Sequence, residues 1–184
     1  VKIFNEKEVD ELVFLDTSAM QNGGPDYGLI QDVASEAFMP IAYGGGSSST
    51  NQIERLFRCG IEKVVINSSC HTNPALVKDS CRIAGSQSIV VAIDVKKTFW
   101  GQYEVYIFNG TVKTGCDPVV YAKKAQELGA GEIVVTSIDR EGTGRGFDLE
   151  LIKKVVDAVD IPVVAQGGAG TLEHLRSAVS VAKA

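Results

Sequence analysis

The sequence has 184 residues, which is enough for one domain with a sizeable hydrophobic core. Hydrophobic residues make up 45% of the chain and charged residues 22%, as is typical of a globular protein. The formal net charge of −5 and the pI near 5.1 argue against nucleic acid or an anionic membrane as the main partner. No run of about 18 apolar residues occurs, so we expect no transmembrane helix.

The predicted elements alternate between strand and helix along the whole chain. Apolar, β-branched runs that predict buried parallel strands lie at 11–16, 40–43, 63–67, 88–94, 132–137 and 161–166. Helical patterns lie between or after them, at 28–37, 50–59, 74–84, 117–129, 148–158 and 171–182. The segment 103–113 instead alternates in polarity and turns at Asn109-Gly110, which predicts a β-hairpin. No linker divides the chain, so we predict a single domain over residues 1–184.

An internal repeat helps to choose between the two folds that this alternation allows, a closed barrel and an open doubly wound sheet. Residues 32–53 and 154–175 both read as a helix end, a proline, an apolar strand, a Gly-Gly turn and the next helix. The aligned glycines are Gly45 with Gly167 and Gly46 with Gly168, at an offset of 122 residues. Two strands thus recur four strands later, which predicts a (β/α)8 barrel, incomplete here and holding units 2 to 7. A flavodoxin-like open sheet is the alternative.

In a barrel the active site is formed at the C-terminal ends of the strands. The candidate residues at these ends are Asp16, Gly44, Gly45, Gly46, Asn67, Ser68, Asp94, Thr136, Ser137, Gly167 and Gly168. Each glycine turn leads from a strand into a helix, where free backbone N–H groups suit a phosphate, so twin turns suit a substrate with two phosphates. The alternative is that the glycines only make tight turns. Asp94 follows the most apolar run, and we predict that it acts as a general acid or base, unless it only caps a loop or pairs with a lysine.

Charged residues precede three of the predicted strands at the opposite end of the barrel. They are Glu11, Lys63 and Glu132. Their even spacing predicts a ring of mixed charge at the barrel floor, and on the residues alone a simple solubilising role explains them equally well.

Seven stretches of the chain resemble one family, the cyclase subunit of imidazole glycerol phosphate synthase in histidine biosynthesis. They are VDELVFLD, AYGGG, EKVVIN, GSQSIVVAIDVK, ELGAGEIVVTSIDREGT, GFDLELIKKV and PVVAQGGAG. The resemblance implies a (β/α)8 barrel enzyme that needs no cofactor or metal. It implies a glutaminase partner that supplies ammonia. The substrate is then a bis-phosphate ribulosyl aminoimidazole carboxamide nucleotide, and the product is imidazole glycerol phosphate.

The resemblance also assigns roles to individual residues. Asp94 matches a catalytic aspartate, and Glu11, Lys63 and Glu132 match charged residues that gate ammonia at the barrel floor, which favours function over solubility there. The residues matched or placed at the two phosphate and substrate sites are Gly45, Gly46, Asn67 and Ser68 for one site, and Thr136, Glu141, Gly142, Gly167 and Gly168 for the other. Glu141 stands where the family usually has aspartate, and Ser47–Thr50 replace the usual residues after the first turn.

Several family features have no counterpart in the chain. The family's second catalytic aspartate and a loop lysine lie on the first β/α unit, and part of the second phosphate site lies on the eighth strand. We therefore expect the sequence to be truncated at both ends and these 184 residues alone to be inactive.

Two other functions remain open from the sequence. The first is amidation of a surface-polysaccharide sugar, the role of a paralogue of this cyclase. The altered turn at Ser47–Thr50 favours this function because it suits a different substrate. The second is binding without catalysis, in which the chain is a barrel fragment that binds a partner or an anion. The cysteines and histidines form no metal-ligand pattern and no C-x-x-C pair, so we interpret the thiols as reduced and the protein as cytoplasmic.

Overall fold

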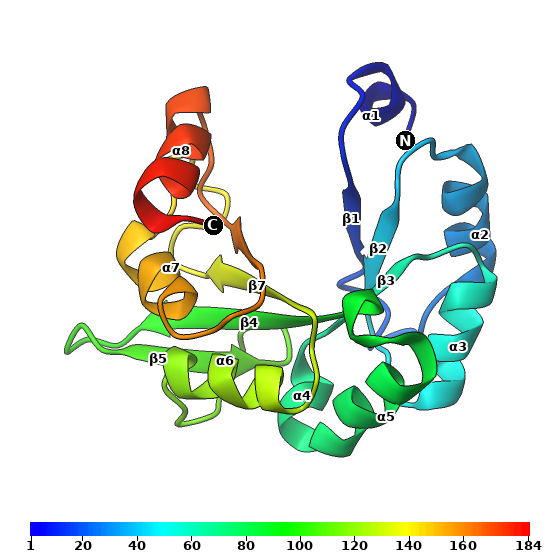
Figure 1. Cartoon of the computed structure of the whole chain (residues 1–184), viewed down its shortest axis with the longest axis horizontal. Coiled ribbons are helices and arrows are strands. Elements are labelled where there is room, and N and C mark those ends of the chain that lie inside the picture. The colour runs from blue at the N-terminus through cyan, green and yellow to red at the C-terminus, as the bar shows by residue number, and fades with distance from the viewer. The chain divides into compact units, whose positions relative to one another are not determined.

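The computed structural model describes all 184 residues, and the chain divides into two compact units, Val1–Val90 and Val91–Ala184. Figure 1 shows the course of the chain and names its elements. None of the helices has the length and apolar composition needed to cross a membrane.

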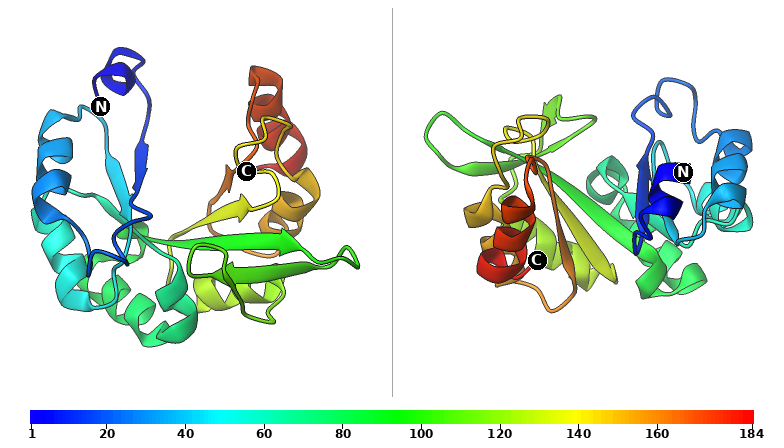
Figure 2. Two further views of the ribbon diagram at one scale, coloured as in Figure 1. Left: turned by 180° about the vertical axis from the view of Figure 1, so that it is seen from behind. Right: turned by 90° about the horizontal axis from the view of Figure 1, so that it is seen from above.

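The first unit is a parallel sheet with helices packed beside it. Its elements are α1 (Lys2–Glu6), β1 (Leu12–Leu15), α2 (Tyr27–Glu36), β2 (Ile41–Gly44), α3 (Thr50–Arg58), β3 (Lys63–Ile66), α4 (Ser68–Thr72), α5 (Pro74–Ala84) and a 3-10 turn (Ser86–Ser88). β2 lies between β1 and β3, and both pairings are parallel. Helix α3 packs against α2, α5 and β3, and both views in Figure 2 show α2 and α3 on the same face of these strands.

The second unit continues the alternation and contains the hairpin. Its elements are β4 (Ile89–Lys97, whose first two residues belong to the first unit), β5 (Tyr103–Ile107), β6 (Val112–Lys113), α6 (Pro118–Glu127), β7 (Glu132–Ser137), α7 (Leu149–Val156), β8 (Val163–Gln166), α8 (Leu172–Ser177) and a π-helical turn (Ala178–Ala182). β7 pairs with β4 and with β8, while β5 pairs antiparallel with β4 and with β6. Helix α6 packs against β5 and β7, and α7 packs against α6 and β8.

Burial explains why the apolar runs form central strands. All four residues of β2 are buried, and so is every residue of β7 after Glu132. A strand that is apolar along its whole length buries both of its faces only when helices or barrel side chains cover them, as in parallel β/α folds. The helices turn apolar stripes toward these strands, for example Ile53 and Leu56 of α3, which are fully buried.

The architecture confirms the predicted fold class, an incomplete (β/α)8 barrel. Within the first unit the strands lie in sequence order, β1-β2-β3, whereas a flavodoxin-like sheet places its first strand between the second and the third. The internal repeat is also present in the strand register. Leu12 of β1 pairs with Ile41 of β2, and the repeat-related residues Ile133 of β7 and Val163 of β8 pair in the same way.

Two local features differ from the sequence prediction. β4 does not end at Asp94 but continues to Lys97, because β5 supplies hydrogen-bond partners along this extension. Asp94 therefore lies within a strand, opposite Tyr106 of β5. A short helix, α4, also begins at Ser68 directly after β3, whereas the sequence predicted the next helix only from residue 74.

Candidate active site at the strand ends

The first glycine turn is packed against the loop that follows β1. Gly46 has a φ of 60°, and a Cβ atom at this position would lie 3.1 Å from Cβ of Ala19. Asp16 shapes that loop, because its Oδ1 accepts hydrogen bonds from the backbone N–H groups of Ser18 (2.9 Å) and Ala19 (3.0 Å). The close approach of the two loops therefore needs glycine at position 46.

The start of helix α3 is capped by reciprocal side-chain hydrogen bonds. Oγ of Ser49, the N-cap, accepts from the Gln52 N–H (3.4 Å), and Oε1 of Gln52 accepts from the Ser48 N–H (2.8 Å) and the Ser48 hydroxyl (3.1 Å). This is a variant of the capping box. The N–H group of Ser48 is thus already bonded, which leaves the N–H groups of residues 45–47 as the candidate anion donors of this turn.

Asn67 and Ser68 lie at the end of β3, beside the first glycine turn. They follow β3, and the Ser68 hydroxyl donates to Oδ1 of Asn67 (3.1 Å). The neighbouring Ser69 hydroxyl donates to the carbonyl oxygen of Ser47 (2.9 Å), which fixes the start of α4 against the turn. The first unit by itself therefore brings together Gly45, Gly46, Asn67 and Ser68.

The second glycine turn lies against the loop 138–148, which connects β7 with α7. Gly167 and Gly168 have φ angles of 93° and 98°. A Cβ atom on Gly167 would lie 3.1 Å from Oε2 of Glu141, and one on Gly168 would collide with the carbonyl oxygen of Gly146. The Gly146 N–H also donates to the carbonyl oxygen of Gly168 (2.7 Å). The second unit thus places Glu141 beside Gly167.

The helix that follows the second turn is capped like the first, at an offset of 122 residues. Oγ1 of Thr171, the N-cap of α8, accepts from the His174 N–H (3.3 Å), and Nδ1 of His174 accepts from the Gly170 N–H (3.1 Å). Thr171, His174 and Gly170 correspond to Ser49, Gln52 and Ser48. His174 therefore has a structural role in the turn.

Asp94 and Thr136 lie on neighbouring strands of the second unit. Asp94 is half-buried on β4, and Thr136 is buried on β7. The N–H group of Ile138 donates to the carbonyl oxygen of Val95 (2.9 Å), which aligns the end of β7 with the part of β4 just after Asp94. Gly142 is exposed in the loop 138–148, and no other part of the protein lies within 4 Å of where its Cβ would be.

The charged residues predicted at the barrel floor are partly buried. Nζ of Lys63, at the start of β3, lies 2.7 Å from Oε2 of Glu11, which precedes β1. The two side chains are 23% and 29% exposed, so this pair is shielded more than an ordinary surface ion pair. Glu132 lies at the half-buried start of β7 in the second unit.

Two tyrosines near these sites were not identified from the sequence. Tyr43 of β2 is fully buried, and its hydroxyl lies 3.5 Å from Oδ2 of Asp16. Burial, followed by the nearby Asp16 charge, raises the pKa of Tyr43 well above its usual value, so the hydroxyl stays protonated. Tyr103 of β5 donates to Oδ1 of Asp148 (2.8 Å). The sequence around a tyrosine in an apolar run does not indicate a hydrogen-bond partner that is distant in the chain. The Ser49-x-x-Gln52 spacing, in contrast, could have predicted the capping box at the start of α3.

The arrangement offers two backbone cradles for anions and one carboxylate, Asp94, on a strand of the second unit. No group of three or more His, Cys, Asp or Glu side chains is placed to hold a metal ion. Backbone N–H groups at a strand end can bind a phosphate, and a carboxylate can transfer protons.

Comparison with known proteins gives consistent matches over the whole chain. Residues 1–184 match the protein family described as "Histidine biosynthesis protein". A putative imidazole glycerol phosphate synthase subunit HisF from Leptospira interrogans is 47% identical over 181 residues, which cover 97% of this chain and 71% of the relative. The HisF subunit from Saccharolobus solfataricus is 45% identical over 183 residues, covering 99% of this chain and 72% of the relative.

A putative imidazole glycerol phosphate synthase subunit named hisF2, from Pseudomonas aeruginosa, is also similar. It is 44% identical over 176 residues, which cover 95% of this chain and 70% of the relative. The chain thus spans about 70% of the length of these relatives.

Proposed function

Because this chain belongs to the HisF family of imidazole glycerol phosphate synthase subunits, we propose that it is a cyclase of histidine biosynthesis. In this role it uses ammonia to convert a bis-phosphate ribulosyl aminoimidazole carboxamide nucleotide into imidazole glycerol phosphate and the carboxamide ribotide.

The observation that carries the proposal is the pair of repeat-related glycine turns. Each turn ends a parallel strand, precedes a capped helix and presents backbone N–H groups that can bind a phosphate. We assign one phosphate of the substrate to Gly45, Gly46, Asn67 and Ser68. We assign the other to Gly142, Gly167 and Gly168, with Glu141 and Thr136 contacting the substrate nearby. A substrate with a phosphate at each end accounts for the duplication.

Asp94 is the proposed acid–base residue of this chain. Ammonia addition and ring closure both need protons to be moved at nitrogen and oxygen atoms, and a half-buried carboxylate can accept and return them. Asp94→Asn keeps the size of the side chain but removes its basicity. We expect this variant to lose at least about a hundredfold in kcat, because general acid–base catalysis contributes typically that much or more.

The relatives are named as subunits of a synthase, and we propose that this chain also works with a partner, a glutaminase that supplies the ammonia. The partly buried pair of Lys63 and Glu11, with Glu132 on β7, is the proposed gate for ammonia at the barrel floor. We place the enzyme in the cytoplasm, where its four free cysteines remain reduced.

The test is an activity assay on the complete protein that contains this sequence, with the histidine-pathway nucleotide and ammonium as substrates. We expect imidazole glycerol phosphate to form, as followed by absorbance and identified by mass spectrometry. Formation of the product by the wild type but not by Asp94→Asn supports the proposal. No turnover of the nucleotide by wild-type protein refutes it.

A second candidate function is supported by the first glycine turn. The hydroxyls of Ser48 and Ser49 and the amide of Gln52 fill the space beside the turn with polar groups. Such a turn also suits the HisF-like paralogue that acts in the amidation of a surface-polysaccharide sugar. Ammonia release toward a sugar acceptor, without turnover of the histidine-pathway nucleotide, would favour this function.

A further inference from the structure

The loop 138–148 is held at both of its ends by the hairpin formed by β4 and β5. At its start, the backbone N–H of Lys97 donates to Oδ2 of Asp139 (2.9 Å), and the N–H of Ile138 donates to the carbonyl oxygen of Val95 (2.9 Å). At its end, the hydroxyl of Tyr103 donates to Oδ1 of Asp148 (2.8 Å). The side chains of Asp139 and Asp148, which are distant from the hairpin in the sequence, thus accept hydrogen bonds from it.

The bond at the end of the loop also involves helix α7. Asp148 is the N-cap of α7, and the same Oδ1 atom accepts from the Leu151 N–H (3.2 Å). Tyr103 therefore holds the residue at which the loop ends and the helix begins. Hydrogen bonds to an ionised carboxylate are stronger than hydrogen bonds to a neutral acceptor.

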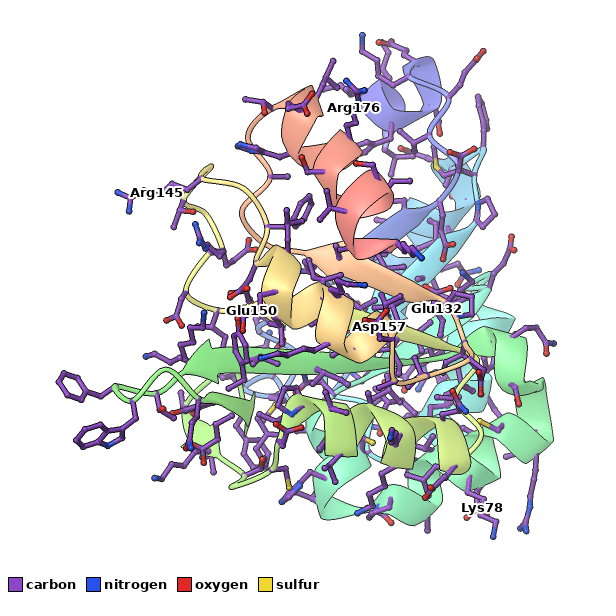
Figure 3. All side chains as sticks on the ribbon, turned by 60° about the vertical axis from the view of Figure 1, so that its left-hand side comes forward. Lys78, Glu132, Arg145, Glu150, Asp157 and Arg176 are labelled. Atoms are coloured by element: carbon purple, nitrogen blue, oxygen red, sulfur yellow. The ribbon has the colours of Figure 1, made fainter.

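Two lysines hold the Tyr103 side chain in place. Nζ of Lys97 and Nζ of Lys154 lie 4.7 and 5.2 Å from the centre of its ring, and both ammonium groups bond to Glu150, at 3.5 and 2.8 Å. Glu150 is in the first turn of α7, and in Figure 3 it lies on the side of this helix that faces β4. Burial raises the pKa of Tyr103 to about 12, so its hydroxyl remains a proton donor in the physiological range.

The middle of the loop, in contrast, makes side-chain hydrogen bonds only within the loop, from and to the Thr143 hydroxyl. Residues 141–145 are exposed, and Arg145 points into solvent in Figure 3. The loop is hydrogen-bonded to the second glycine turn through backbone groups, the Gly146 N–H and the carbonyl oxygen of Gly168 (2.7 Å), and Glu141 and Gly144 pack beside Gly167 and Gly170 without hydrogen bonds to them. Glu141 and Gly142, which we assigned to the phosphate site, belong to this exposed part. Their order therefore depends on how firmly the loop ends are held.

We propose that the β4–β5 hairpin positions the loop 138–148 for phosphate binding, with Tyr103 as the positioning residue at the loop end and Asp139 as its counterpart at the loop start. The proposal rests on the proposed function, because that function places a phosphate at this loop. With both ends anchored, the loop is ordered before the ligand arrives, so less of the binding free energy is lost in ordering it. Without the Tyr103 bond, the ligand itself must order the loop.

The experiment compares Tyr103→Phe, which removes only the hydroxyl, with Tyr106→Phe as a matched control. Tyr106 is on the same strand and half-buried, and its hydroxyl makes no hydrogen bond within the protein. Limited digestion with trypsin reports on the loop, because Arg145 lies in its exposed part. We expect cleavage after Arg145 to be about tenfold faster in Tyr103→Phe, as the loss of one charge-assisted hydrogen bond predicts, and unchanged in Tyr106→Phe.

Binding is measured in the same assay, as the concentration of inorganic phosphate that halves the cleavage rate at Arg145, with sodium chloride as the ionic-strength control. We expect Tyr103→Phe to need about tenfold more phosphate than the wild type. In the activity assay, the KM for the nucleotide should rise by a similar factor while kcat changes less than about twofold, because Tyr103 does not touch the reacting atoms.

Variants of Asp148 separate positioning from simple folding. Asp148→Asn keeps an oxygen that can cap α7 and accept from Tyr103 but removes the charge, so its cleavage rate should lie between those of the wild type and Tyr103→Phe. Asp148→Ala loses both hydrogen bonds and should be cleaved at least as fast as Tyr103→Phe. Equal cleavage of Tyr103→Phe and wild type at Arg145 overturns the proposal. Faster cleavage with an unchanged half-protecting phosphate concentration also overturns it. Absence of nucleotide turnover in the wild type refutes the proposed function alone, since the phosphate-protection difference is measured without turnover.

Discussion

Two of the glycines of the proposed second phosphate site, Gly142 and Gly168, are expected to respond very differently to the same substitution. Both have positive φ angles, 70° and 98°. Replacement by alanine forces a side chain into the left-handed region, which costs about 1–2 kcal/mol at either position. At Gly142 nothing lies near the new methyl group, so no further cost arises. At Gly168 the methyl group would collide with the carbonyl oxygen of Gly146 and lie 3.0 Å from Cβ of Arg140.

The collision adds an overpacking cost of about 1–3 kcal/mol for Gly168→Ala, because the neighbouring atom is backbone and cannot rotate away. We therefore expect the free energy of unfolding to fall by about 1–2 kcal/mol in Gly142→Ala and by about 2–5 kcal/mol in Gly168→Ala. Urea titration followed by far-ultraviolet circular dichroism measures both, and the two positions lie in the same unit, so the values compare directly. Equal destabilisation by the two substitutions would refute the close packing of the loop on the turn.

Two further predictions concern the ion pair and the tyrosine. Lys63→Met removes the cation that lies 2.7 Å from Glu11. A double-mutant cycle with Glu11→Gln, measured by urea titration, should give a coupling free energy of about 1 kcal/mol, a value discounted for the partial exposure of both side chains. A coupling free energy near zero would contradict the pairing. The pKa of Tyr103 is raised from 10.0 to about 12, so the folded state holds this proton more tightly than the unfolded state. The stability advantage of wild type over Tyr103→Phe should therefore be complete below about pH 10 and decline toward about pH 12; a constant advantage across this range would argue against the assignment.

The parts of the structure that the sequence predicted are those that depend on local patterns. Apolar runs such as 132–137 are long enough and β-branched enough to specify strands, and the glycine pairs with their following helices mark strand ends. The repeat offset of 122 residues carried more information, because it related elements that are far apart in the chain. It predicted the fold class, and the pairs Leu12–Ile41 and Ile133–Val163 agree with it to within one residue, because β7 follows β1 at an offset of 121 residues and β8 follows β2 at an offset of 122.

The parts that the sequence did not predict depend on partners distant in the chain. The extension of β4 past Asp94 through Lys96 and Lys97 has no apolar pattern, and it is a strand only because β5 pairs with it. Likewise, the hydrogen bond from Tyr103 to Asp148 joins residues 45 positions apart. Each residue alone has an ordinary local explanation, a strand aromatic and a helix N-cap, so no local rule indicates that they meet.

The capping of α3 and α8 narrows the choice of phosphate donors in both turns. In each turn, the residue before the N-cap gives its N–H group to a side chain of the following helix, Ser48 to Gln52 and Gly170 to His174. A donor already paired inside the protein adds little to the binding of an anion, since the internal bond must first break. The N–H groups left for the proposed phosphates are those of residues 45–47 and 167–169, and four of these six residues are glycines. The internal repeat thus extends from the order of elements down to the side-chain hydrogen bonds that cap α3 and α8.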